Sequence, residues 1–155
     1  MHKPWIASTV GLIVCLALPA HAQQSIGKAT SVKPQAEGTV AGELAPNKDV
    51  HANETVKTGN SGQANLQFVD RTQLSVGPMS TVRLDKFVYN PDRGTGTVVV
   101  NATRGAYRFV TGVQDPRSYE IKTPYATLGV RGTVLEVVIN EPVRTGRTQR
   151  ARRNR

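Results

Sequence analysis

The feature that most constrains this chain is its supply of β-branched residues, placed at every second position along many short segments. From residue 23 onward the sequence holds 18 Val, 15 Thr and 3 Ile, against only 6 Leu. β-Branched side chains suit a pleated strand, and the shortage of Leu removes the usual core of a helix. In residues 64–69, for example, Ala64, Leu66 and Phe68 share one face and polar side chains share the other. The pattern favours strands over helices.

Short turns separate these alternating segments. Residues 90–94 (Asn-Pro-Asp-Arg-Gly) and 114–117 (Gln-Asp-Pro-Arg) are typical turn sequences. Strands are predicted over 64–69, 74–76, 82–89, 97–100, 106–110, 119–123 and 133–139, with weaker candidates at 38–44 and 54–57. We therefore predict an all-β fold, either a twisted β-roll or solenoid-like stack, or a sandwich of short antiparallel strands.

The first residues differ from the body of the chain. Residues 1–22 have a basic start, an apolar run over 5–18 and a small-x-small end at Ala22, which is the layout of a signal peptide. The apolar run is shorter than the roughly 20 residues that a transmembrane helix needs. An uncleaved anchor and lipid attachment through Cys15 are the alternatives. We expect cleavage after Ala22 and a periplasmic or secreted protein with one β domain, residues 25–140.

The net charge of +9 belongs mainly to the two ends. Besides Lys3, six arginines lie in the last twelve residues: Arg144, Arg147, Arg150, Arg152, Arg153 and Arg155. The rest holds 13 basic against 11 acidic residues, a net +2, so nucleic acid is not an expected partner. We expect residues 141–155 to be a disordered basic tail that contacts anionic lipid or polymer. A frameshift or truncated gene is an open alternative explanation for it.

Candidate catalytic and metal-binding residues are scarce. Cys15, the only cysteine, lies in the predicted signal peptide, so thiol chemistry and Cys-based zinc or iron–sulfur sites are excluded. His51 is the only histidine beyond the predicted cleavage site, and its polar neighbours predict a surface loop rather than part of a Ser–His–Asp triad. Asp70, Asp92 and Asp115 lie beside turns, where turn chemistry explains them. We predict no enzyme activity, no cofactor and no metal.

Residues 123–133, Thr-Pro-Tyr-Ala-Thr-Leu-Gly-Val-Arg-Gly-Thr, form the most unusual stretch. Glycines flank Arg131 just before an apolar strand, and glycine lets another backbone approach closely. We expect the guanidinium of Arg131 to be held near the sheet by a carboxylate or by backbone carbonyls, as a structural clamp rather than a ligand-binding group. On that reading Arg131→Ala lowers the melting temperature by several degrees.

This stretch resembles the signature of the FecR domain, a Thr-Pro-x-Ala-x-x-Gly-Val-Arg-Gly-Thr pattern. Blocks at 54–70, 74–84 and 104–112 resemble the same family in the same order, and the resemblance spans 26–139. The positions that it marks as signature residues, expected to be structural, are Thr123, Pro124, Gly129, Arg131, Gly132, Thr133, Gly105, Phe109 and Gly112.

The resemblance implies an all-β extracytoplasmic module. The founding members receive a signal from an outer-membrane transporter and pass it through a membrane helix to a cytoplasmic anti-sigma segment. We expect this protein to depart from that arrangement, because the sequence shows no pattern for that helix or that segment, and a basic tail stands where further strands usually follow the signature. Two functions stay open. One is a binding or sensory module that contacts an envelope protein, by strand addition at an exposed edge. The other is an envelope structural module, or one that binds peptidoglycan or a surface polysaccharide.

Overall fold

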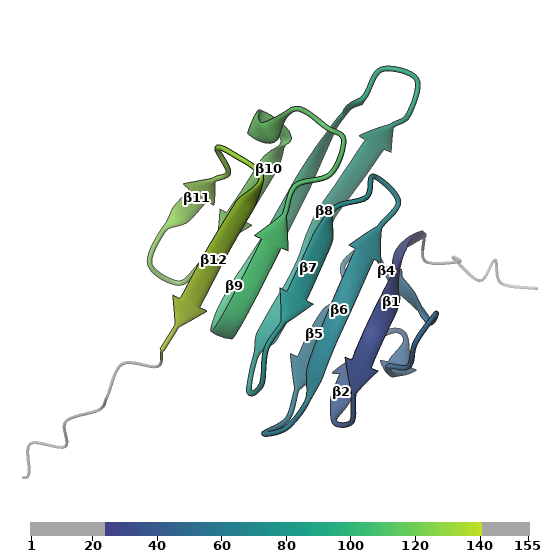
Figure 1. The fold of residues 1–155 in the computed structure, drawn as a ribbon, viewed down its shortest axis with the longest axis vertical. Coiled ribbons are helices and arrows are strands. Elements are labelled where there is room, and N and C mark those ends of the chain that lie inside the picture. The colour runs from purple at the N-terminus through teal and green to yellow at the C-terminus, as the bar shows by residue number, and fades with distance from the viewer. Residues whose placement is uncertain (1–23, 141–155) are drawn as a thin grey trace, which may run out of the picture.

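Strands make up most of residues 24–140, as the ribbon in Figure 1 shows. The computed structural model describes residues 24–140, so the predicted signal peptide and the predicted disordered tail lie outside the described residues. Within 24–140 the one helical element is the short 3-10 helix η1 (Pro116–Ser118). The prediction of an all-β fold is confirmed.

The twelve strands hydrogen-bond into one continuous sheet that curls into two layers, and strand β9 (Thr95–Val110) belongs to both. Layer A contains, in order of pairing, β4 (Asp49–His51), β1 (Ser25–Lys33), β6 (Gln63–Phe68), β7 (Gln73–Val76), the second part of β9 and β12 (Val134–Ile139). Layer B contains β3 (Gly42–Glu43), β2 (Ala36–Gly38), β5 (Thr55–Thr58), β8 (Thr81–Asn90), the first part of β9, β10 (Tyr119–Lys122) and β11 (Thr127–Gly129). All pairs are antiparallel except β9 with β10.

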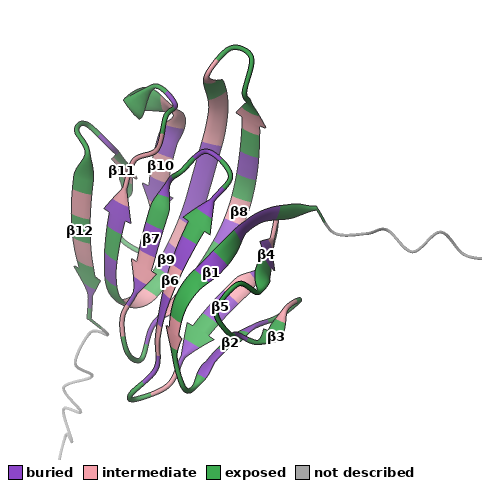
Figure 2. Cartoon of the chain, turned by 45° about the vertical axis from the view of Figure 1, so that its right-hand side comes forward, coloured by how far each residue is buried: buried purple, intermediate pink, exposed green. Residues whose placement is uncertain are grey.

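The core lies between the layers, where alternate side chains of each strand point inward. Figure 2 shows this alternation as bands of buried and exposed residues along the strands. Two aromatic pairs join the layers. The rings of Phe68 on β6 and Phe87 on β8 are 5.5 Å apart, and those of Phe109 on β9 and Tyr119 on β10 are 5.6 Å apart. Such pairs add to the stability that burial of their area provides.

The two strands predicted over 97–100 and 106–110 are parts of the single strand β9. Gly105 lies where β9 leaves layer B and enters layer A, with a φ of +105° that L side chains rarely adopt. A Cβ atom at Gly105 would lie 1.9 Å from Oγ of Ser80. The glycine therefore bends the strand and does not end it, which the sequence pattern did not indicate.

The N-terminal region differs most from the prediction. Strand β1 was not expected, because its fully buried residues include Gly27 and Ala29, which carry little hydrophobic signal. The single strand expected over 38–44 is instead the hairpin of β2 and β3. His51 lies in β4 with a half-buried side chain, so its placement in a surface loop was wrong.

Gly105→Ala tests the bend in β9. We expect the free energy of unfolding to fall by about 2–4 kcal/mol, because the alanine would combine backbone strain with a clash against Ser80. Gly129→Ala is the matched control, since a Cβ there meets no atom within 4 Å. Urea denaturation of both variants measures the effect, and equal midpoints for the two would contradict the role given to Gly105.

Candidate functional site

The signature stretch connects β10 to β12 by way of β11. Thr123 closes the turn after β10, where its Oγ1 accepts the N–H of Ala126 at 3.0 Å and donates to the Ala126 carbonyl at 2.9 Å. Pro124 is exposed in this turn. The carbonyl of Thr133 accepts the N–H of Thr111 at 2.9 Å, which begins the pairing of β12 with β9. The stretch therefore delivers β12 to the edge of layer A.

The three signature residues that precede this stretch lie on or beside β9. Gly105 forms the bend described above, and Phe109 is 1% exposed in the core. Gly112 follows the strand, where a Cβ would lie 2.1 Å from the carbonyl oxygen of Asp70. Its N–H donates to the hydroxyl of Tyr119 at 3.0 Å. These positions require small or apolar residues because the backbone or the core leaves no room for others.

The clamp expected at Arg131 does not form among residues 24–140. Arg131 is exposed, and no carboxylate or carbonyl of those residues accepts a hydrogen bond from its guanidinium. Gly129 and Gly132 beside it are also exposed, with no atom of the described chain within 4 Å of their Cβ positions. The sequence pattern located the segment, but it carried no information on the direction of the side chain.

Because Arg131 is exposed, the expected result of Arg131→Ala changes. We now expect the free energy of unfolding to stay within about 0.5 kcal/mol of the wild type, as for other surface positions. Thermal denaturation measures this, with Phe109→Ala as the destabilised comparison. A loss of several degrees in Arg131→Ala would show that the arginine has a partner outside the described residues.

Asp70 holds the turn after β6 against the loop that precedes β10. Its carboxylate is 0% exposed, and Oδ2 accepts bonds from Thr72 Oγ1 at 2.7 Å, Gln114 Nε2 at 2.7 Å and the Tyr119 hydroxyl at 3.1 Å. Burial raises the pKa of the Tyr119 hydroxyl, which keeps it a donor. From the sequence, Asp70 was explained by turn chemistry alone. Asp70 nevertheless continues the inward alternation of residues 64, 66 and 68.

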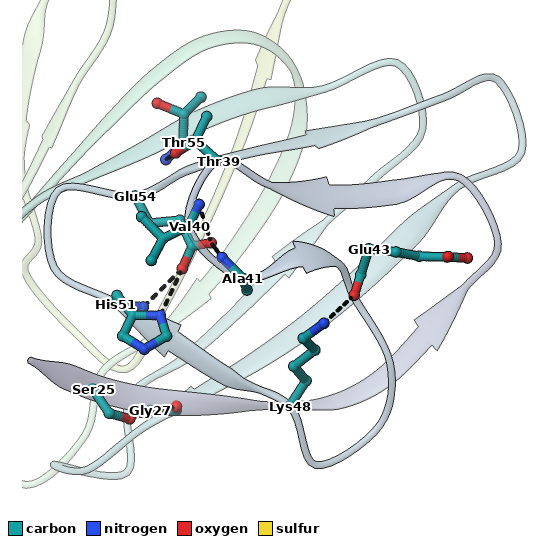
Figure 3. Close-up of polar contacts among 10 residues, drawn as sticks. All are labelled: Ser25, Gly27, Thr39, Val40, Ala41, Glu43, Lys48, His51, Glu54 and Thr55. Atoms are coloured by element: carbon teal, nitrogen blue, oxygen red, sulfur yellow. Dashed lines mark hydrogen bonds and ion pairs between the residues drawn. The ribbon is translucent and has the colours of Figure 1, made fainter. Parts of the chain in front are cut away.

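Glu54 is a second buried carboxylate, at the turn between β4 and β5, and Figure 3 shows its contacts. Oε1 accepts the N–H groups of Val40 at 3.2 Å and Ala41 at 2.7 Å, and Oε2 accepts that of His51 at 2.8 Å. The carboxylate thereby ties the β2–β3 hairpin to β4. The buried position of Glu54 was not predicted from the sequence. Glu54 does continue the alternation of the buried Val56 and Thr58 of β5, at every second residue.

The pairing of His51 with Glu54 does not make a catalytic centre. Nδ1 of His51 lies 3.6 Å from Oε2 of Glu54 and has no hydrogen-bond partner. A triad also needs a nucleophile hydrogen-bonded to the other ring nitrogen, and among residues 24–140 no serine or threonine hydroxyl forms a hydrogen bond with His51. The same residues contain no group of three or more His, Cys, Asp or Glu arranged to hold a metal ion. The two carboxylates serve the fold.

Glu54→Gln tests this structural role. The amide keeps the size but puts an NH₂ group where a carboxylate oxygen accepts backbone N–H bonds, so we expect a loss of about 2–4 kcal/mol in unfolding free energy. Glu37→Gln, at an exposed position of β2, should be neutral. Chemical denaturation followed by circular dichroism measures both. A Glu54→Gln variant as stable as Glu37→Gln would contradict the assignment.

Strand β12 ends layer A and has no neighbour on its outer side among the described residues. The bond from Thr111 N–H to the Thr133 carbonyl fixes which of its groups point outward. Hydrogen-bonded residues alternate in an antiparallel pair, so Leu135, Val137 and Ile139 bond to β9. The backbone groups of the intervening residues, Val134, Glu136 and Val138, face away from β9.

The side chains along this edge are mostly apolar. Val138 is 69% exposed and Val134 is 47% exposed, although both are β-branched residues in a regular strand. The one charged side chain is Glu136, whose Oε1 lies 3.5 Å from Nη1 of Arg108 on β9. The other end strands, β3, β4 and β11, have two, three and three residues, whereas β12 has six. Short end strands protect against edge pairing, and β12 is not protected in this way.

The outer face of β1, β6 and β7 carries mostly uncharged polar side chains, with Lys28 of β1 opposite Gln67 and ion-paired to Asp49. It contains a shallow depression lined by Thr30, Asn65, Leu66, Gln67, Gln73 and Ser75. Amide and hydroxyl side chains of this kind donate and accept hydrogen bonds without a net charge. This face differs from a second, open depression beside β2 and β5, where Glu37 and Glu43 lie with Lys57 and Arg104.

A family model described as "FecR protein" matches residues 54–149. The chain belongs to the FecR family. The match begins at Glu54 and extends past β12 into residues outside the described part of the chain, whereas the resemblance noted from the sequence spans 26–139. No curated protein and no solved structure matches the chain.

Membership in the FecR family indicates a signalling-related envelope module. The family is regulatory and sensory, and its domains are typically extracytoplasmic. No helix within residues 24–140 is long and apolar enough to cross a membrane.

Proposed function

We propose that this FecR module is a non-catalytic sensor that acts by protein–protein contact, and that an envelope protein adds an extended segment to the free edge of β12. Strand addition supplies backbone hydrogen bonds for affinity, and alternate side chains supply specificity. The observation that carries the proposal is the outward direction of the backbone groups of Val134, Glu136 and Val138 on an edge with exposed valines.

The position of the signature supports the same surface. Of residues 123–133 only Val130 is buried, the described chain shows no metal-binding group there, and the stretch leads directly into β12. Their conformation sets where the edge strand begins, through the bond between Thr111 and Thr133. The signature is therefore best explained as the segment that presents the edge.

We further propose that the module is exported. The layout of residues 1–22 supports a signal peptide cleaved after Ala22, and this agrees with the extracytoplasmic location typical of FecR domains. A periplasmic or secreted chain would meet its partner on the outer side of the cytoplasmic membrane. N-terminal sequencing of the protein from an envelope fraction, with Gln23 as the expected first residue, tests this step.

Photo-crosslinking tests the contact itself. A photoreactive phenylalanine analogue replaces Val138 in one variant and Val88 in another, since Val88 is 50% exposed on β8 in layer B. After irradiation of whole cells, we expect the first variant to form an adduct with an envelope protein and the second to form none. Mass spectrometry identifies the adduct. Adducts of equal yield from both positions, or from Val88 alone, would overturn the proposal.

A second candidate function is binding of peptidoglycan or a surface polysaccharide, and the polar depression on the outer face of β1, β6 and β7 favours it. Gln67 and Gln73 line its depression with amide groups that match sugar hydroxyls. On this reading the protein sediments with purified cell wall, and Gln67→Ala with Gln73→Ala weakens that binding, while Val138→Lys does not. Truncation after Val143 shows whether the basic tail contributes to this cell-wall binding, because a contribution from its charges would be sensitive to salt.

A further inference from the structure

The free edge of β12 also fits a second copy of itself. Because the other end strands have two or three residues, only another β12 offers an edge of equal length among residues 24–140. Pairing through the same strand of both copies closes the contact about a twofold axis and leaves only the short end strands β3, β4 and β11 free among the described strands. We propose that two copies pair antiparallel through β12 when no partner protein occupies it. This rests on the proposed function, because it describes how the same edge is covered at rest.

The side chains exclude one register for this pairing and favour another. The outward backbone groups belong to even-numbered residues, so an antiparallel partner must set even-numbered residues opposite one another. Setting Glu136 opposite Glu136 of the second copy would place like charges together. A register with Val138 opposite Val138 of the second copy avoids this, because Glu136 then faces Asn140, whose amide can donate to the carboxylate.

The same register also joins the apolar side chains that face the core. Val137 and Leu135 on this side of β12 are only half-buried, although they pack against the core. With Val138 at the twofold axis, Val137 lies opposite Ile139 of the second copy. The pairing therefore removes apolar surface from water on both faces of the strand, which favours association.

Electrostatics do not oppose the contact. Glu136 is the one charged residue of β12, and its own Arg108 lies 3.5 Å away, so each edge brings a neutralised pair to the interface. The carbonyl of Asn140 accepts the hydroxyl of Tyr125 at 3.5 Å, which leaves its second lone pair for a backbone N–H of the second copy. The edge thus has both donors and acceptors to match its copy.

Analytical ultracentrifugation of the full chain tests the pairing. We expect a monomer–dimer equilibrium in which Val138→Lys raises the dissociation constant by roughly tenfold or more, because two lysines would lie opposite each other at the axis. Asn140→Asp, an exposed change outside the strand, should weaken the dimer by facing Glu136 with a second carboxylate. Val88→Lys, at a valine of similar exposure on β8, should leave it unchanged.

Single cysteines test the register, in a chain whose only native cysteine is removed by Cys15→Ser. Directly opposite residues of a hydrogen-bonded pair have Cα atoms about 5.5 Å apart, within the range of a disulfide. Val138→Cys should therefore form a covalent dimer on mild oxidation, whereas Val134→Cys should not. A disulfide at Val134 alone, or equal linkage at both positions, would overturn the register and the proposal with it.

The outcomes also separate this inference from the proposed function. A chain that stays monomeric at all concentrations, for example because residues 141–155 cover the edge, would overturn self-pairing. The Val138 crosslink to an envelope protein could still form in that case. Conversely, a dimer linked through Val138→Cys, together with no adduct other than the dimer in cells, would support self-pairing and count against the partner protein.

Discussion

The structure depends on the bend of β9 at Gly105. One strand pairs with β8 and β10 in layer B and then, beyond the bend, with β7 and β12 in layer A. The positive φ and the close approach of Ser80 exclude a side chain at this point. Because the same strand carries the pairing of both layers, the bend determines how the layers face each other across the core. It also determines where β12 lies.

Two buried carboxylates complete the architecture where strands alone do not. Asp70 holds the loop before β10 to the turn after β6, and Glu54 holds the β2–β3 hairpin to β4. Both accept hydrogen bonds from backbone or side-chain donors, and the described residues contain no group of three or more His, Cys, Asp or Glu that could hold a metal ion. A chain without cysteine in this region uses such networks, together with its aromatic pairs, to fix loops that disulfides often secure in exported domains.

Much of the fold could be predicted because its inward residues are large and apolar. The segment expected over 64–69 corresponds to β6, and Val82 and Leu84 indicated β8. β1 could not be predicted, because Gly27 and Ala29 face the core there. The buried acids followed the same alternation, but an acid normally marks the outside of a strand. No sequence pattern reveals that β12 is the last strand of its layer, since that depends on pairing between distant segments.

The proposed function rests on the outer edge of β12, which has no neighbouring strand among the described residues. We propose that the outward backbone groups of β12 form the contact surface, and amide hydrogen exchange by NMR tests this most directly. In dilute protein the amides of Val134, Glu136 and Val138 should exchange faster than those of the intervening residues, Leu135 and Val137. At high concentration, or with a bound partner, Glu136 and Val138 should gain protection. Uniform protection along β12 in dilute protein, or no change on association, would contradict the claim.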